Sequence, residues 1–187
     1  MAWRWLWGVG LACALAVGPA RAAEFKITPL PSADALEVSG RIGSRFAASV
    51  QAALDAYPAT RVLVVRSRGG LLHEARKVAA LLNARGIAIR ADGRCASACA
   101  VLWAATDARE LTPGARLGLH RSKWPVPLPA PLRVLAEKRS DRANVRTFLA
   151  AGFSPELAAR AAQTPSSSMY WIGARELKQE RVPFVLE

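Results

Sequence analysis

One strand–helix–strand segment constrains the fold of this chain more than any other feature. The stretch from Arg61 to Ser67 (RVLVVRS) is largely apolar and rich in β-branched residues, which is typical of a buried parallel strand. Gly69 and Gly70 interrupt this strand, and an amphipathic helix is predicted from Leu71 to Arg85. A second strand is predicted from Ile87 to Ala91. Two strands joined through a helix lie parallel, so the segment predicts an α/β layer.

The rest of the chain extends this pattern without a repeat, a low-complexity tract or a second domain. Further helices are predicted over residues 44–57, 96–105, 132–151 and 174–179, with a short one starting at Ser154-Pro155. Further strands are predicted over residues 35–38, 117–120 and 182–186, with Asp92-Gly93 as a turn. Residues 23–33, 123–131 and 164–170 are interpreted as loops. We therefore expect a single α/β domain over residues 23–187.

The N-terminal residues 1–22 have the pattern of an export signal. Arg4 precedes an apolar run from Leu6 to Val17, and Ala20-Arg21-Ala22 is a small-x-small cleavage site. Cleavage after Ala22 leaves 165 of the 187 residues and lowers the formal net charge from +12 to +10, because Arg4 and Arg21 are lost. The location predicted is periplasmic or secreted, with no stable membrane span after cleavage. The less favoured alternative is an uncleaved anchor, because the run is shorter than the roughly 20 residues of a spanning helix.

The basic composition does not by itself identify a partner. The chain has 26 Lys and Arg residues against 14 Asp and Glu, and the positive charge is spread along its length. A nucleic-acid site needs clustered basic residues interleaved with aromatic ones, which this sequence lacks, so no nucleic-acid partner is expected. Affinity for anionic lipid or an acidic peptide stays open.

Two cysteines remain after the predicted cleavage, since Cys13 lies in the signal. In an oxidising compartment Cys95 and Cys99 are interpreted as a disulfide, and their spacing of four would place them on one face of a helix, about 6 Å apart at Cα. A redox role is the weaker interpretation, because redox pairs more often have two intervening residues. No second cysteine pair exists, so neither a metal nor another cofactor is expected.

The same segment contains the candidate nucleophile. Ser97 follows a turn at the start of a small apolar helix, where the first N–H groups have no intrahelical partner. His120 ends a downstream strand and is the candidate base, with His73 as its rival. Gly69 and Gly70 lack a Cβ, so the backbone there can approach a substrate closely. A nucleophile, a base and free N–H groups are what acyl transfer requires.

These motifs resemble the proteolytic subunit of the Clp protease, and more closely its exported relatives in bacteria with a Cys-x-Ser-x-Cys motif. The likeness rests on Ser-x-Gly-Gly between strand and helix, a serine among small residues, and Gly-x-His on a strand. It covers about residues 36–186 and implies a ClpP/crotonase-like fold of stacked β-β-α units. It also allows a homo-oligomer, although the stacking helix would be represented only by Leu132 to Ala151. Arg68 stands where the family has proline.

The resemblance assigns a role to each candidate residue. Ser97 matches the nucleophile, His120 the general base, and the N–H groups of Gly70 and Ala98 the oxyanion donors. The family's acid falls at Ser168, in a loop with Ser166 and Ser167; Asp141 is the only other candidate that the sequence offers. The prediction is an exported serine hydrolase acting on a peptide or small acyl substrate through a Ser–His dyad. The alternative is an inactive binding or scaffold protein of the cell envelope with the same fold.

Overall fold

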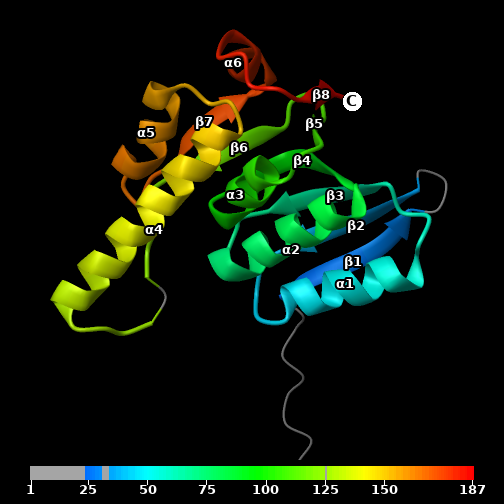
Figure 1. The fold of residues 1–187 in the computed structure, drawn as a ribbon, viewed down its shortest axis with the longest axis horizontal. Helices are drawn as coiled ribbons and strands as arrows, with labels where there is room; N and C mark the ends of the chain where they lie inside the picture. Colours follow the sequence, from blue (N-terminus) through cyan, green and yellow to red (C-terminus); the bar gives the residue numbers. More distant parts are fainter. Residues whose placement is uncertain (1–23, 31–33, 125) are drawn as a thin grey trace, which may run out of the picture.

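A mostly parallel sheet organises the chain. The computed structural model describes residues 24–30, 34–124 and 126–187; the predicted export signal and its cleavage point lie outside them. The described strands are β1 (Phe25–Leu30), β2 (Ala35–Gly40), β3 (Val62–Ser67), β4 (Ala88–Ala96), β5 (Arg109–Leu111), β6 (Arg116–Leu119), β7 (Tyr170–Gly173) and β8 (Val185–Leu186). The described helices are α1 (Phe46–Ala56), α2 (Leu72–Arg85), α3 (Ala98–Ala105), α4 (Ala130–Ala150), α5 (Pro155–Gln163) and α6 (Ala174–Gln179). Figure 1 shows α1, α2 and α3 side by side over the strands.

The strand order is β1-β2-β3-β4-β5-β8, and β6 pairs with both β4 and β7. β2, β3, β4 and β6 are parallel to their neighbours in this set, whereas β1 and β7 add antiparallel edges. The predicted α/β class with a parallel sheet and covering helices is therefore confirmed. The loop predicted over residues 23–33 is wrong where β1 lies: Pro29 is accepted because β1 is an edge strand. The strand β7 was not predicted.

The predicted turn at Asp92-Gly93 is wrong, because β4 continues through it. Gly93 has φ +66°, and the register between β3 and β4 shifts between Val65 and Ser67. An irregularity of this kind bends a strand and re-aims its second half. The first half of β4 pairs with β5 and the second half with β6. The bend therefore brings β6, which carries the candidate base at its end, next to the strand that leads to Ser97.

The core lies between the sheet and helices α1 to α3. Its largest fully buried side chains include Trp103, Phe46, Leu36 and Leu102. α3 is buried all along its length, as its small apolar sequence predicts. By contrast α4 extends away from the sheet (Figure 1), and its first six residues are exposed. No helix in the described part of the chain is long and apolar enough to cross a bilayer.

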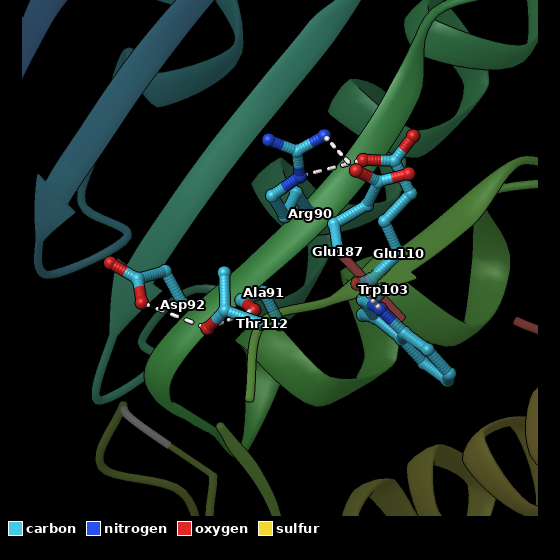
Figure 2. A network of polar contacts seen from close by, with 7 residues as sticks. All are labelled: Arg90, Ala91, Asp92, Trp103, Glu110, Thr112 and Glu187. Atoms are coloured by element: carbon cyan, nitrogen blue, oxygen red, sulfur yellow. Dashed lines mark hydrogen bonds and ion pairs between the residues drawn. The ribbon is translucent and has the colours of Figure 1, made fainter. Parts of the chain in front are cut away.

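A polar network fixes the far end of β4 (Figure 2). Arg90 Nε donates to Glu110 Oε2 at 2.7 Å, and its Nη2 lies 3.6 Å from Glu187 Oε2. The indole Nε1 of Trp103 donates to the carbonyl oxygen of Glu110 at 2.8 Å. Thr112 Oγ1 donates to Asp92 Oδ1 at 2.9 Å. These contacts attach β5 and the C-terminal residues to β4, at the end of the strand remote from Ser97.

Glu74 joins α2 to the start of α1. Its carboxylate is buried and accepts hydrogen bonds from the Ala47 N–H and from Lys77 Nζ, each at 2.9 Å. Arg45, the N-cap of α1, supplies no side-chain cap, so Glu74 satisfies a helix-terminal donor from another element. Burial alone raises the pKa of Glu74, but the hydrogen bonds from Ala47 and Lys77 outweigh it and hold the pKa below its ordinary value.

We predict that Glu74→Gln lowers the free energy of unfolding by about 1–3 kcal/mol near neutral pH, because a charged acceptor is lost from a buried site. A depressed carboxyl pKa stabilises the fold above the unfolded-state pKa, and this stabilisation is lost as pH falls through the lower folded-state pKa. The difference between wild type and Glu74→Gln should therefore shrink below about pH 4. Urea unfolding at several pH values measures it, with the exposed Glu156→Gln as control. A gap that does not change with pH would contradict this account.

Candidate active site

Three parallel strands bring the candidate residues to one edge of the sheet. Ser67 is in register with Cys95, and Ala96 with Gly118, so β3, β4 and β6 end side by side. Each strand is followed at once by a candidate segment: the Gly-Gly turn after β3, Ser97 after β4, and His120 after β6. Ligand sites of open parallel sheets commonly lie at such carboxyl ends. The fold thus brings together segments that are well separated in the sequence, from Gly70 to His120.

Ser97 occupies a strained turn between β4 and α3. It is the N-cap of α3 with φ 58° and ψ −122°, a backbone conformation that is costly for a residue with a Cβ, by about 1–3 kcal/mol. Its hydroxyl makes no capping hydrogen bond, and the side chain is half-buried. Its N–H donates to the carbonyl oxygen of Gly118 at 2.8 Å, which ties the turn to β6. A strained strand-to-helix turn of this kind presents a serine hydroxyl to a substrate.

The disulfide between Cys95 and Cys99 is present, as predicted, and it encloses Ser97. The predicted geometry is wrong in one respect: Cys95 belongs to β4 and Cys99 to α3, so the pair does not lie on one helix face. Their Cα atoms are 5.1 Å apart because the chain reverses direction at Ser97. Both cysteines are buried. The bond closes the turn from both sides and so restrains the conformation of Ser97.

The Gly-Gly turn packs directly against the Ser97 turn. A Cβ on Gly69, which has φ +91°, would lie 2.5 Å from the Ala96 carbonyl oxygen and 2.7 Å from Ser97 Cβ. The hydroxyl of Ser67 accepts the Gly69 N–H at 3.0 Å and shapes the turn. Gly70, with φ +146°, is held on its other side by Ile42, whose carbonyl oxygen accepts the Leu71 N–H.

The predicted oxyanion donors are both uncommitted. Within the described residues the N–H of Gly70 donates no hydrogen bond, and Ala98 is the first residue of α3, whose N–H has no intrahelical acceptor. Both residues line the cavity that contains Ser97. The positive end of the α3 dipole adds to the attraction for negative charge at this point.

His120 follows β6 and lines the same cavity. Its Nδ1 lies 2.7 Å from the carbonyl oxygen of Arg121. A carbonyl oxygen can only accept, so this hydrogen bond places the proton on Nδ1 and leaves the lone pair on Nε2. Among the described residues no hydrogen bond joins Ser97 Oγ to His120, although both residues line this cavity. The rival base, His73, also lines this cavity, but it is exposed and its Nε2 lies 3.5 Å from Glu74 Oε1.

In the described part of the chain, neither candidate for a third group is hydrogen-bonded to the imidazole. Ser168 is exposed, its N–H donates to Pro165, and it does not line the cavity with Ser97. Asp141 Oδ1 accepts the Ser122 N–H at 2.5 Å instead. The carbonyl of Arg121 is therefore the group that orients His120 in this structure. Sequence reasoning could not find it, because any residue supplies a backbone carbonyl.

The cavity has a volume of about 840 Å³, within the range of sites for small ligands. Its apolar wall includes side chains from the N-cap and first turn of α2, from α3, β6 and α4, namely Leu71, Leu72, Val101, Leu119 and Phe148. Its polar wall includes residues that the sequence gave no reason to select: Arg41, Arg76, Ser122, Lys123, Ser140 and Asn144. The described residues hold no group of three His, Cys, Asp or Glu side chains that could bind a metal ion.

Comparison with known proteins identifies the fold. No protein-family model and no curated protein matches the sequence. The structure is similar to that of a ClpP1 mutant from Listeria monocytogenes, with a TM-score of 0.65 and 17% sequence identity. The alignment covers 83% of this chain and 93% of that one. The chain therefore has a ClpP-like fold, as the resemblance implied.

Proposed function

We propose that this protein is a serine hydrolase of the peptidase class, with Ser97 as its nucleophile. The observation that carries the proposal is that Ser97, His120 and the backbone of Gly70 and Ala98 all line one cavity. These residues lie in three separate segments of the sequence, so it is the fold that brings them into one cavity. The ClpP-like fold supports a peptidase among the hydrolases.

The proposed reaction uses the four groups in sequence. Ser97 Oγ attacks the carbonyl carbon of the substrate while its proton passes to His120 Nε2. The N–H groups of Gly70 and Ala98 bind the oxyanion of the tetrahedral intermediate. His120 then protonates the departing amine or alcohol, and the acyl group stays on Ser97. Water, deprotonated by His120, releases the acid and restores the serine.

A dyad in place of a triad is part of the proposal. An acid normally holds the imidazole in one tautomer, and here the Arg121 carbonyl supports that orientation without a negative charge. It stabilises the imidazolium less than a carboxylate does, so we expect a slow enzyme. The role of Ser168 stays a prediction for which the present geometry offers no contact.

Export and self-association belong to the same proposal. The leader-like residues 1–22 and a disulfide at Cys95–Cys99 both support an oxidising compartment outside the cytoplasm.

Contact with a second copy of the chain is supported by exposed apolar side chains at the projecting start of α4, namely Leu132, Val134 and Leu135.

A non-catalytic binding protein is the second candidate. Two observations on the described residues favour it: no hydrogen bond joins Ser97 to His120, and the imidazole is hydrogen-bonded to a backbone carbonyl instead of a carboxylate. If the folded wild-type protein fails to react with any serine-directed probe, this candidate replaces the first.

The first prediction about the reaction concerns Ser97. A fluorophosphonate probe should label the mature protein, and Ser97→Ala should abolish labelling, because the probe reacts only with an activated hydroxyl. Mass spectrometry of the labelled peptide identifies the residue. Ser49→Ala, on α1 and away from the cavity, is the matched control and should label like wild type. Equal labelling of Ser97→Ala and Ser49→Ala would exclude Ser97.

The second prediction separates the two histidines. His120→Gln should slow fluorophosphonate labelling about 100- to 10,000-fold, the usual contribution of a general base. If His73 is the base, the large loss moves to His73→Gln and His120→Gln stays active. The rate of labelling is measured for both variants at several pH values, after circular dichroism has shown that each is folded.

The third prediction tests the contact between the glycine turn and the serine turn. Gly69→Ala should reduce the labelling rate at least about tenfold and destabilise the fold by about 1–3 kcal/mol, because the new Cβ overlaps Ser97 and Ala96. Gly114→Ala is the control: Gly114 has a similar φ of +80°, but a Cβ there meets nothing within 4 Å. Both variants share the backbone cost, so only Gly69→Ala should lose labelling. A similar loss in both would attribute it to backbone strain alone.

A further inference from the structure

The cavity beside Ser97 has an unbalanced charge. Three cationic side chains line it, from Arg41, Arg76 and Lys123, and none of the described lining residues is acidic. Arg41 and Lys123 are exposed, whereas Arg76 is partly buried. A cavity with one sign of charge concentrates ligands of the opposite sign.

Arg76 is the cation that the fold holds in place. It extends from α2, and its Nη2 donates to Asn144 Oδ1 at 2.8 Å. Asn144 is itself buried and donates through Nδ2 to Ser122 Oγ at 3.1 Å. Ser122 Oγ in turn donates to Ser140 Oγ at 2.8 Å. This neutral chain fixes the direction of the guanidinium without neutralising its charge.

Arg76 also has a buried donor for which the described residues supply no acceptor. Its Nε is buried and has no hydrogen-bond partner among the described residues. Three other arginines are paired with acids: Arg66 with Asp92, Arg85 with Asp55 and Arg90 with Glu110. Arg109 Nε is likewise buried without a partner among the described residues, but Arg109 lies over the Trp103 ring and does not line this cavity. Arg76 forms no such ion pair within the described part of the chain. Burial lowers the pKa of Arg76, and the charge of Arg146 lowers it further. An unpaired, partly desolvated guanidinium is costly unless an anion binds it.

We propose that Arg76 is a specificity-determining residue that binds a carboxylate of the substrate, in the cavity where Ser97 attacks. Planar guanidinium groups suit carboxylates because they donate two parallel hydrogen bonds. The apolar wall beside it, from Leu72, Val101 and Phe148, accommodates the uncharged part of the ligand. The substrate class is therefore a short peptide with an acidic side chain or a free C-terminal carboxylate. That the bound molecule is a substrate rests on the proposed hydrolase function. That Arg76 binds its carboxylate does not, since binding does not require Ser97.

Binding is measured first, on a protein that cannot turn over. The Ser97→Ala variant is titrated into peptides that carry an uncharged nitrobenzoxadiazole dye, and fluorescence anisotropy gives the affinity. Three peptides are compared: Ala-Ala-Glu-Ala-amide, Ala-Ala-Gln-Ala-amide, and Ala-Ala-Gln-Ala with a free C-terminus. The first and third should bind about 10- to 100-fold more tightly than the second, if each carboxylate can reach Arg76. A difference between the first and third identifies the side chain or the terminus as the source.

The same titration with Arg76→Gln added should remove the preference, so that the three affinities converge. Arg76→Lys keeps the charge but not the paired donors and should restore only part of it. Arg133→Gln, an exposed arginine on α4 that lines no described cavity, removes an equal charge and should leave the preference intact. A preference that is equally weak in Arg76→Gln and Arg133→Gln would reduce the effect to net charge and overturn the proposal.

The hydrolase and the carboxylate site can fail separately. If the probe labels Ser97 but binding shows no preference for a carboxylate, the hydrolase proposal stands and the proposed role of Arg76 is wrong. If the preference depends on Arg76 but the probe never labels Ser97, the hydrolase proposal is wrong and the protein is a carboxylate-binding protein. Where both hold, kcat/KM for the Glu peptide over the Gln peptide, followed by mass spectrometry, should fall towards one in Arg76→Gln.

Discussion

The strained conformation of Ser97 is the constraint on which the rest of the site depends. A serine with φ 58° is unstable in isolation, so the surrounding structure must hold it. Three contacts do so: the disulfide from Cys95 to Cys99, the hydrogen bond from the Ser97 N–H to Gly118, and the close packing of Gly69. Each contact comes from a different strand end. The parallel arrangement of β3, β4 and β6 therefore maintains the turn. A change that disrupts this arrangement disrupts the site as well.

The distribution of charge gives the molecule two unlike ends. At one end of β4, acids and arginines are paired, as Arg90 is with Glu110 and Glu187 (Figure 2). At the other end, the cavity residues Arg41 and Arg76 are given no acid by the described part of the chain. Pairing stabilises a fold, whereas an unpaired cation in a cavity is costly and is retained where a ligand completes it. The paired charges thus lie where they hold strands together, and the unpaired cations lie in the cavity beside the candidate nucleophile.

The sequence predicted the parallel core and the positions of the candidate residues because both depend on local patterns. The strand ending at Ser67, the following helix and the apolar α3 follow from periodicity and from Gly69-Gly70. What it could not predict depends on contacts between distant segments. Asp92-Gly93 has the sequence of a typical turn. It becomes a bend within one strand because the residues after it pair with β6. Arg76 is one more charged residue on an amphipathic helix until Asn144 from α4 is brought against it.

The missing acid of the site then has a physical interpretation. In a triad, the acid contributes less to the rate than the serine or the histidine, because its task is to orient and stabilise the imidazole. The Arg121 carbonyl performs the first part of that task at 2.7 Å from His120 Nδ1, and it introduces no negative charge. A carboxylate at that position would add an anion to a cavity whose cations face the substrate. It would also compete with a substrate carboxylate for Arg76. A neutral orienting group and a cationic binding group are therefore compatible with each other, as the proposed binding of a carboxylate at Arg76 requires.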